Sequence, residues 1–353
     1  MVAFHASSAI PFAILRELAP GAAARWQAAH PGWTIAAWGP LWLGLPAETA
    51  DHAVRQSGDG RATGVVDGVV WNDLQVRERW RVRGQQLQSD DHRQLAIEEL
   101  AAHGPRGLGE LRWHGAAAVL HRAQGAALLA RDPLGIGWLG YAATAELQVF
   151  SSDPRLDGQA VPPGVALRVE AKGWLAQPIR SAAENLPYFR EIPDELRGDD
   201  GRVLGEGLRV RLQAAVAAAR RGVGELVQTP ADAGLRRWAG AAEGAKAGST
   251  TGLWSPQGWP SLAAREWPEP EPWPRPGAWP AVEPPEPVIS ADAVDRNARI
   301  WRATALVDRD LRQARAQALD QGRFLVLPHL DPAVLAWLGA IGRVRRIEIL
   351  GAT

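Results

Sequence analysis

Short apolar runs separated by turn residues fill residues 1–180, a pattern typical of a β-rich layer. Gly64–Trp71 is interpreted as two strands joined by a turn at Asp67-Gly68, because an Asp-Gly pair between apolar residues favours a hairpin. A helix is predicted over 92–103, where partial helical spacing of apolar residues ends at Gly104. Further strands are predicted at Ala116–His121, Ala126–Ala130, Leu147–Ser151 and Val165–Val169.

The rest of the chain has longer-period patterns that indicate helices. Residues 203–221 carry an amphipathic stripe that stops at Gly222. A second helical region is predicted from Ser290, a plausible N-cap, to about residue 321, where Gly322 ends it. A short strand at Phe324–Leu327 follows, and Asp331 is expected to cap one more helix with Pro332 at its first position.

A Trp/Pro-rich segment, residues 254–287, interrupts this helical half. Its Pro density excludes a helix or a central strand and favours polyproline II or an irregular loop. Two interpretations stay open. The segment wraps the domain and buries its own indoles, or Trp267, Trp273 and Trp279 form a candidate partner surface.

Composition and charge narrow the possible functions. The formal net charge is +0, so no global field directs the chain to nucleic acid or an anionic membrane. The apolar stretch Ala9–Leu15 lacks the basic flank of a secretory signal, and no apolar run reaches the roughly 18 residues of a spanning helix. A cytoplasmic protein is therefore expected. The sequence has no Cys, which excludes disulfides, thiolate catalysis and Cys-ligated zinc within it.

The eight His residues show no metal-ligand spacing, so no metal is expected. The only tight acid–His cluster, Asp90-Asp91-His92, is interpreted as a helix N-terminus rich in Asp.

Five segments resemble, in order, parts of asparagine synthetase and its relatives, the β-lactam synthetases and lasso-peptide cyclases. The first two match an Asn-Gly turn and a Ser-Asp pair before a helix in that family, and the third and fourth match an Arg-Asp-Pro-Leu-Gly-Ile segment and a Pro-Pro-Gly turn. The fifth is similar to a Val-Pro-Phe-Leu-Asp-Pro segment of the synthetase domain. In this chain they are Asp67–Asn72, Ser89-Asp90, Arg131–Ile136, Pro162–Gly164 and Leu327–Pro332.

The resemblance implies an α/β fold of the α+β kind. Residues 1–180 would form a degenerate glutaminase-like domain, an αββα sandwich of the N-terminal-nucleophile type. Residues 195–353 would form a reduced, mostly helical remnant of an adenylating synthetase domain, interrupted by the segment 254–287.

The glutaminase chemistry of the family is expected to be absent. The family's nucleophile is a Cys exposed when the initiator Met is removed, and the matching position is Val2, whose side chain cannot attack. The oxyanion-hole Asn of the family falls on Asp67, where an ionised carboxylate would repel a developing oxyanion. The resemblance thus leaves a vestigial glutamine pocket around Asp67, Gly68 and Asp90. No catalytic residue is expected there.

The adenylating site is also expected to be degenerate. The family's Ser-Gly-Gly-x-Asp-Ser loop cradles pyrophosphate with backbone N–H groups, but here the matching stretch is Gln228–Ala233. Its glycines are gone and Pro230 has no N–H, so only Asp232 remains of the nucleotide loop.

Three functions remain open. The favoured one is a non-catalytic homologue, without cofactor, that serves as a structural or regulatory partner in an amide-forming or peptide-modifying pathway. Its protein partner would be an intact amidoligase homologue or a precursor peptide, and no nucleic acid or membrane is expected. The alternative is a divergent ligase that uses ATP and Mg, and the third is a small-molecule binder that uses the old glutamine pocket.

Overall fold

The computed structural model describes residues 3–6, 9–84, 91–179, 201–223, 226–229, 311–320, 324–327, 331 and 334. Most of the first half of the chain is included. The segment 254–287 and the helical region predicted over 290–310 lie outside the described residues.

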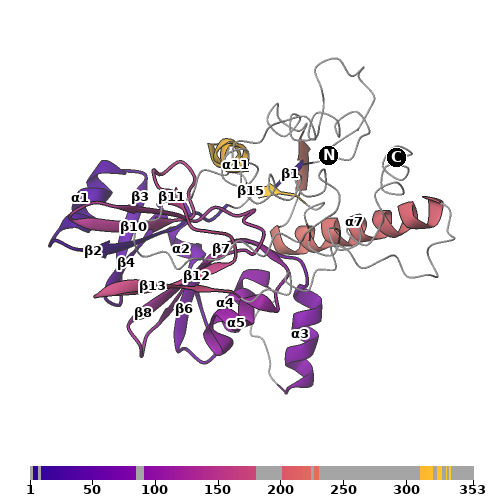
Figure 1. Cartoon of the computed structure of the whole chain (residues 1–353), viewed down its shortest axis with the longest axis horizontal. Coiled ribbons are helices and arrows are strands. Elements are labelled where there is room, and N and C mark those ends of the chain that lie inside the picture. Colours follow the sequence, from indigo (N-terminus) through magenta and orange to yellow (C-terminus); the bar gives the residue numbers. More distant parts are fainter. Residues whose placement is uncertain are drawn as a thin grey trace, which may run out of the picture.

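Two six-stranded antiparallel sheets form the centre of the first half (Figure 1). The first sheet has the order β11-β9-β10-β2-β4-β3. Its strands are β11 (Gln159–Ala160), β9 (Gly140–Ala143), β10 (Leu147–Ser151), β2 (Ala13–Glu17), β4 (Leu41–Pro46) and β3 (Trp33–Trp38).

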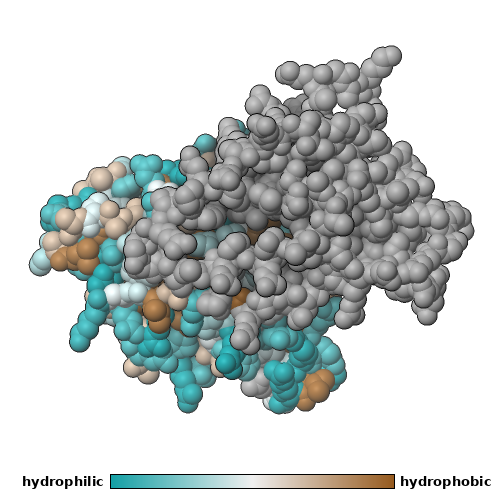
Figure 2. All heavy atoms as spheres, in the orientation of Figure 1, coloured by the Kyte–Doolittle hydropathy of each residue, from teal (hydrophilic) through white to brown (hydrophobic). Residues whose placement is uncertain are grey.

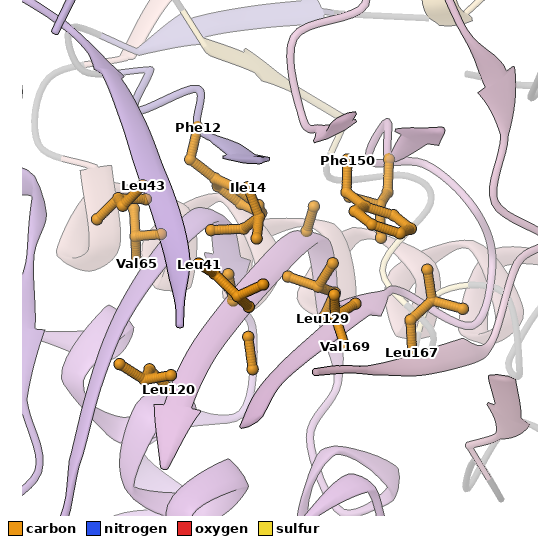
Figure 3. Packing of buried hydrophobic residues seen from close by; sticks show 14 of the residues in the cluster. Phe12, Ile14, Leu41, Leu43, Val65, Leu120, Leu129, Phe150, Leu167 and Val169 are labelled. Atoms are coloured by element: carbon orange, nitrogen blue, oxygen red, sulfur yellow. The ribbon is translucent and has the colours of Figure 1, made fainter. Parts of the chain in front are cut away.

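The second sheet has the order β13-β12-β8-β7-β6-β5. Its strands are β13 (Gly173–Pro178), β12 (Val165–Glu170), β8 (Ala126–Arg131), β7 (Trp113–His121), β6 (Ala62–Val70) and β5 (Arg55–Gln56). The two sheets bury apolar side chains against each other, as a β-sandwich does. Figure 3 shows Ile14 and Leu41 from the first sheet packed with Val65, Leu129 and Leu167 from the second.

Helices cover the outer faces of both sheets. On the second sheet, α4 (His92–His103), α5 (Pro105–Gly109) and α3 (Asp73–Val82) pack over β6 and β7 through a second buried cluster, which includes Val66, Ile97 and Trp80. On the first sheet, α1 (Ala22–Ala29) packs on Leu15 and Leu147. The short α2 (Ala50–Ala53) contacts β4 and contributes Ala53 to the cluster between the sheets. The result is a mixed α/β fold with four layers, the αββα sandwich that was expected.

Several predicted elements appear within one to three residues of their expected ends. The strand Leu147–Ser151 and the helix 92–103 with its stop at Gly104 are confirmed. The helix predicted over 203–221 is α7 (Gly201–Val223), and the strand at Phe324–Leu327 is β15 (Phe324–Val326).

One prediction about the site strand is wrong. Asp67 and Gly68 form no turn, because β6 runs without a break from Ala62 to Val70 and pairs with β7 along its whole length. Gly68 keeps the strand extended, and its missing side chain admits the facing backbone. A Cβ at position 68 would lie 2.3 Å from the carbonyl oxygen of His114.

The described parts of the second half make a small third sheet. In it, β1 (Ala3–Ala6) lies between β14 (Leu226–Thr229) and β15, antiparallel to both. The helix α7 contacts β6 and α4, and α11 (Leu311–Asp320) lies at the upper edge of the sandwich in Figure 1. These contacts join the two halves of the chain.

On the face seen in Figure 2, the described residues are mostly hydrophilic with scattered apolar spots. Large exposed apolar side chains occur singly, for example Leu74 and Val82 on α3 and Leu175 on β13. No helix in the described part of the chain is long and apolar enough to cross a membrane.

The tight packing at Gly68 generates a prediction. Gly68→Ala should lower the free energy of unfolding by roughly 1–3 kcal/mol, because the new methyl group meets backbone that cannot move aside. Urea denaturation followed by circular dichroism measures this change. Gly173→Ala is the matched control, since nothing lies within 4 Å of a Cβ there, and it should change stability by less than about 0.5 kcal/mol. Equal effects of the two substitutions would contradict the packing argument.

Candidate functional site

Asp67 lies on the inner face of the second sheet, near the end of the sandwich. Side chains alternate along a strand, so Asp67 is on the same face as Val65, which belongs to the cluster between the sheets. Across the sheet, Asp67 is the register partner of Ala116, and Ala116 is the partner of Arg131 on β8. Asp67 and Arg131, with the small Ala116 between them, therefore form a row across the sheet at the end of the apolar core.

Arg315 of α11 reaches this row from the other half of the chain. Its Nη2 atom lies 2.6 Å from Oδ2 of Asp67, and the two side chains are 4% and 0% exposed. Arg315 shares a helix face with Leu311, Ala318 and Leu319, all buried at helical spacing. The helix thus inserts a charged group with the apolar face that docks on the sandwich.

Four further contacts hold α11 and the chain after it around this ion pair. The Arg312 guanidinium lies 4.3 Å from the centre of the Trp138 ring, and its Nε donates to the carbonyl of Pro154 at 3.1 Å. Asp320, at the end of α11, accepts a bond from Arg155 at 3.2 Å. Asp331 lies 3.5 Å from Arg112. Trp138 follows β8 and Pro154 follows β10, so α11 covers the end of the sandwich where these two strands stop.

Close backbone contacts fix the geometry next to Asp67. A Cβ on Gly115 would lie 2.3 Å from the carbonyl oxygen of Asp67, and a Cβ on Gly137 would lie 2.3 Å from the backbone of Gly115. Gly115 also has φ +146, a backbone conformation that L side chains rarely adopt. Together with Gly68, these glycines let three backbone segments touch with no side chain between them.

Asp132 ties these segments together. Its buried carboxylate accepts backbone N–H bonds from Gly115, Leu134, Ile136 and Gly137 at 2.6–3.1 Å. Burial raises the pKa of Asp132, although these four hydrogen bonds and the neighbouring Arg131 favour its charged form. The hydrogen bonds of the Asp132 carboxylate therefore fix the backbone conformation of the loop.

Arg131 binds carbonyl groups of the same loop and of the chain near it. Its guanidinium donates to the carbonyls of Gly135, Gly137 and Val161 at 2.7–2.8 Å while fully buried. Hydrogen bonds to backbone groups thus give a structural reason for the Arg and the Asp of the Arg131–Ile136 segment, which carries part of the resemblance.

The N-terminus of α4 supports β6 from the outer face. Asp91 caps the helix by accepting a bond from the backbone N–H of Arg93, as expected for an Asp-rich helix start. The buried His92 ring lies 3.0 Å from the carbonyl oxygen of Gly68 through Nε2, which must donate because a carbonyl can only accept. Burial lowers the pKa of His92, while the bond to Gly68 acts in the opposite direction.

Only part of the predicted site lies where the structure can place it. Asp67 and Gly68 are adjacent in β6, at the end of the sandwich. Val2 lies outside the described residues, and β1, which follows it, pairs in the third sheet and not in the sandwich. Asp90, Asp232 and the candidate partner surface of Trp267, Trp273 and Trp279 also lie outside the described residues.

The sequence reasoning missed Arg315, which is 248 residues from Asp67. One signal was available, because Arg315 occupies an apolar position of a helical stripe formed with Leu311, Ala318 and Leu319. A charge at such a position indicates a buried partner. It does not say which one.

The family model of a glutamine amidotransferase domain matches residues 46–156. This range contains Asp67, Gly68 and the Arg131–Ile136 segment. The resemblance to the glutamine amidotransferases is therefore confirmed over residues 46–156. None of the curated proteins matches the chain.

Three solved structures are similar to part of the chain. The glutamine phosphoribosylpyrophosphate amidotransferase from B. subtilis, complexed with ADP and GMP, is 13% identical over 56% of this chain and 57% of its own, with a TM-score of 0.37. An allosteric regulatory enzyme of purine biosynthesis is 14% identical over 58% and 52%, with a TM-score of 0.34. A glutamine aminotransferase class-II domain protein from Silicibacter pomeroyi is 14% identical over 50% and 99%, with a TM-score of 0.28. The chain spans just over half the length of the first two, and the assignment rests on the family model alone.

The first prediction from the site concerns the buried ion pair. Asp67→Ala should lower the free energy of unfolding by about 3–5 kcal/mol, because it leaves the Arg315 charge buried without this carboxylate. Asp320→Ala, which breaks the more exposed pair with Arg155, should lower it by at most about 1 kcal/mol. The double variant Asp67→Leu/Arg315→Met should recover much of the loss, since an apolar pair of similar volume has no charge to desolvate. Stability is measured by urea denaturation. If the losses from changing Asp67 and Arg315 simply add in the double variant, a direct coupling of the two side chains is contradicted.

The second prediction concerns pH. Because the folded-state pKa of His92 is depressed, the unfolded chain binds its proton more readily, and the stability that neutral His92 contributes is present above the unfolded pKa of about 6.5. This contribution is lost as the pH falls below that value. His92→Gln keeps a donor for the Gly68 carbonyl without titrating, so the stability advantage of wild type over this variant should shrink between about pH 7.5 and pH 5.5.

His121 needs a separate control, because burial also lowers its pKa. The half-exposed His121 should show a smaller pH effect, measured as the advantage of wild type over His121→Gln. A pH-independent difference for His92→Gln would contradict the assignment of a neutral, buried imidazole.

Proposed function

We propose that this chain is a non-catalytic relative of the glutamine amidotransferases that acts through binding, as a structural or regulatory partner in an amide-forming or peptide-modifying pathway. One observation carries the proposal. Asp67, which falls on the oxyanion-hole Asn of the resembling families, is buried in an ion pair with Arg315.

The chemistry of that position supports the proposal. Hydrolysis of a carboxamide needs neutral or positive donors aimed at the developing oxyanion. The Asp67 carboxylate accepts hydrogen bonds, and the Arg315 guanidinium occupies the space beside Oδ2, where a substrate group would have to enter. The 353 residues also contain no Cys to serve as the thiol nucleophile.

The position of α11 over the end of the sandwich supports a role in binding. Arg312, Arg315 and Asp320 place one helix of the second half over the end of the sandwich. With this end of the sandwich covered, a partner would bind on the outer surfaces of the domain. The partner class that we propose is an intact amidoligase homologue or a precursor peptide, by analogy with the families that the chain resembles.

The ATP-dependent ligase is the weaker proposal. It needs a phosphate-binding loop after β14, where the chain has Pro230, and Asp232 lies outside the described residues. ATP–pyrophosphate exchange stimulated by a carboxylate substrate would place the ligase first. A binder of small molecules that uses the old glutamine pocket is the third proposal, and the buried Asp67 carboxylate supports it as a polar group that a ligand can contact.

The proposal predicts that the purified full chain releases no ammonia from glutamine above the blank, and that electrophilic glutamine analogues leave its mass unchanged. The expected reason is the absence of both a thiol and an oxyanion donor at the site. A coupled ammonia assay and intact-mass spectrometry make the measurement.

The variant Asp67→Asn/Arg315→Ala provides a second arm, because it restores an amide at position 67 and removes the guanidinium. It should stay inactive, since no nucleophile is gained. Ammonia release by wild type, or its appearance in this variant, would contradict a non-catalytic domain.

A further inference from the structure

The two oxygen atoms of the buried Asp67 carboxylate are in different situations. Oδ2 is 2.6 Å from Nη2 of Arg315, whereas Oδ1 is fully buried and has no hydrogen-bond partner in the part of the chain that the structure describes. A carboxylate normally binds a guanidinium through both oxygens, in two parallel bonds. The Asp67 site therefore has capacity for a guanidinium that Arg315, held by its helix, uses only in part.

The occupant of the site comes from a separable element. α11 has ten residues, and its other polar contacts to the sandwich are at the rim: Arg312 with the Trp138 ring and the Pro154 carbonyl, and Asp320 with Arg155. The pair of Asp320 with Arg155 is exposed and contributes little. Arg315 is thus the main polar anchor of α11. Withdrawal of the helix would uncover the carboxylate without breaking any strand of the sandwich.

The surroundings of Asp67 favour a cation as the replacement. A buried carboxylate without a countercharge is costly, so an anionic or neutral ligand is disfavoured. Arg93 of α4 is near enough that the Asp67 charge acts on it and favours its charged form, but burial lowers the pKa of Arg93. The small side chain of Ala116, the register partner of Asp67, occupies little of the inner face beside the carboxylate.

The kind of cation follows from the geometry. A metal ion is disfavoured, because no group of three or more potential metal ligands occurs among the residues described. A guanidinium is planar, weakly hydrated and able to meet both carboxylate oxygens at once, whereas an ammonium is a compact and strongly hydrated charge. The site already contains a guanidinium, so its shape is compatible with one.

We propose that Asp67 forms a guanidinium-binding site, which Arg315 occupies within the chain and which accepts an arginine side chain or a small guanidine compound when α11 is withdrawn. This inference goes beyond the proposed function. It depends on the carboxylate and its occupant, and it would stand even if the chain were found to release ammonia from glutamine. In the intact chain the tethered Arg315 competes at high effective concentration, so an outside ligand binds well only where α11 is released.

Chemical rescue of Arg315→Ala in the full chain tests the proposal. The variant should melt roughly 5–15 °C below wild type, and millimolar methylguanidinium chloride should restore several degrees in a saturable way. Methylurea, a neutral analogue of similar shape, and sodium chloride at the same ionic strength should not. The rescue should vanish in Asp67→Asn/Arg315→Ala. The matched control Arg312→Ala, on the same helix but at the rim, should gain nothing.

Equal stabilisation by methylurea or sodium chloride would overturn the proposal, as would rescue that persists without the Asp67 carboxylate, or no rescue at all. If Arg315→Ala does not fold, refolding from urea is followed by circular dichroism with and without methylguanidinium. Folding that depends on methylguanidinium and not on methylurea supports the site, and failure to fold in both overturns it.

The source of the ligand is distinguished with two further probes on Arg315→Ala. A larger shift with N-acetyl-arginine methylamide than with free arginine supports a site for an arginine within a protein or peptide. A larger shift with free arginine supports a site for a small molecule. No shift with either compound contradicts the proposed ligand class.

Discussion

The buried ion pair between Asp67 and Arg315 is the interaction on which the joining of the two halves depends. A single charge at the end of an apolar core is strongly unfavourable, so each residue makes the other necessary. Because the partners are 248 residues apart, this local requirement becomes a constraint on the whole chain. It holds α11 over the sandwich, and it includes Asp67, to which the resemblance assigns the place of the family's oxyanion-hole Asn. Chain closure and the proposed loss of hydrolysis thus have one physical origin.

The backbone around this pair is fixed by contacts that do not involve catalysis. Gly68, Gly115 and Gly137 bring three segments within backbone contact, and Asp132 holds them with four hydrogen bonds. Of these residues, Gly68 and Asp132 belong to segments that carry the resemblance to the amidotransferases. The proposed loss of hydrolysis is therefore compatible with keeping residues that shape the backbone, because the two requirements fall on different residues.

The sequence predicts elements whose signals are local. The helix 92–103 was found because its periodicity and its stop at Gly104 agree, and the strand Leu147–Ser151 because it is short, apolar and bounded by turn signals. The Asp67-Gly68 turn was wrong because an Asp-Gly pair favours a turn only where no partner strand holds it extended. The ion pair was missed for a related reason. A charge on a helix stripe shows that a partner exists, and only the folded chain shows that it is Asp67.

The most direct test of the central claim is a crosslink between α11 and the end of the sandwich. The chain has no Cys, so Arg155→Cys/Asp320→Cys introduces a unique pair at a contact of 3.2 Å in the native chain. A short bismaleimide should join the two sites within one folded molecule in high yield, and adding Arg315→Ala should lower that yield sharply. The account predicts both results. A low yield in the folded double variant, no greater than in urea, would contradict the closure of the sandwich by α11.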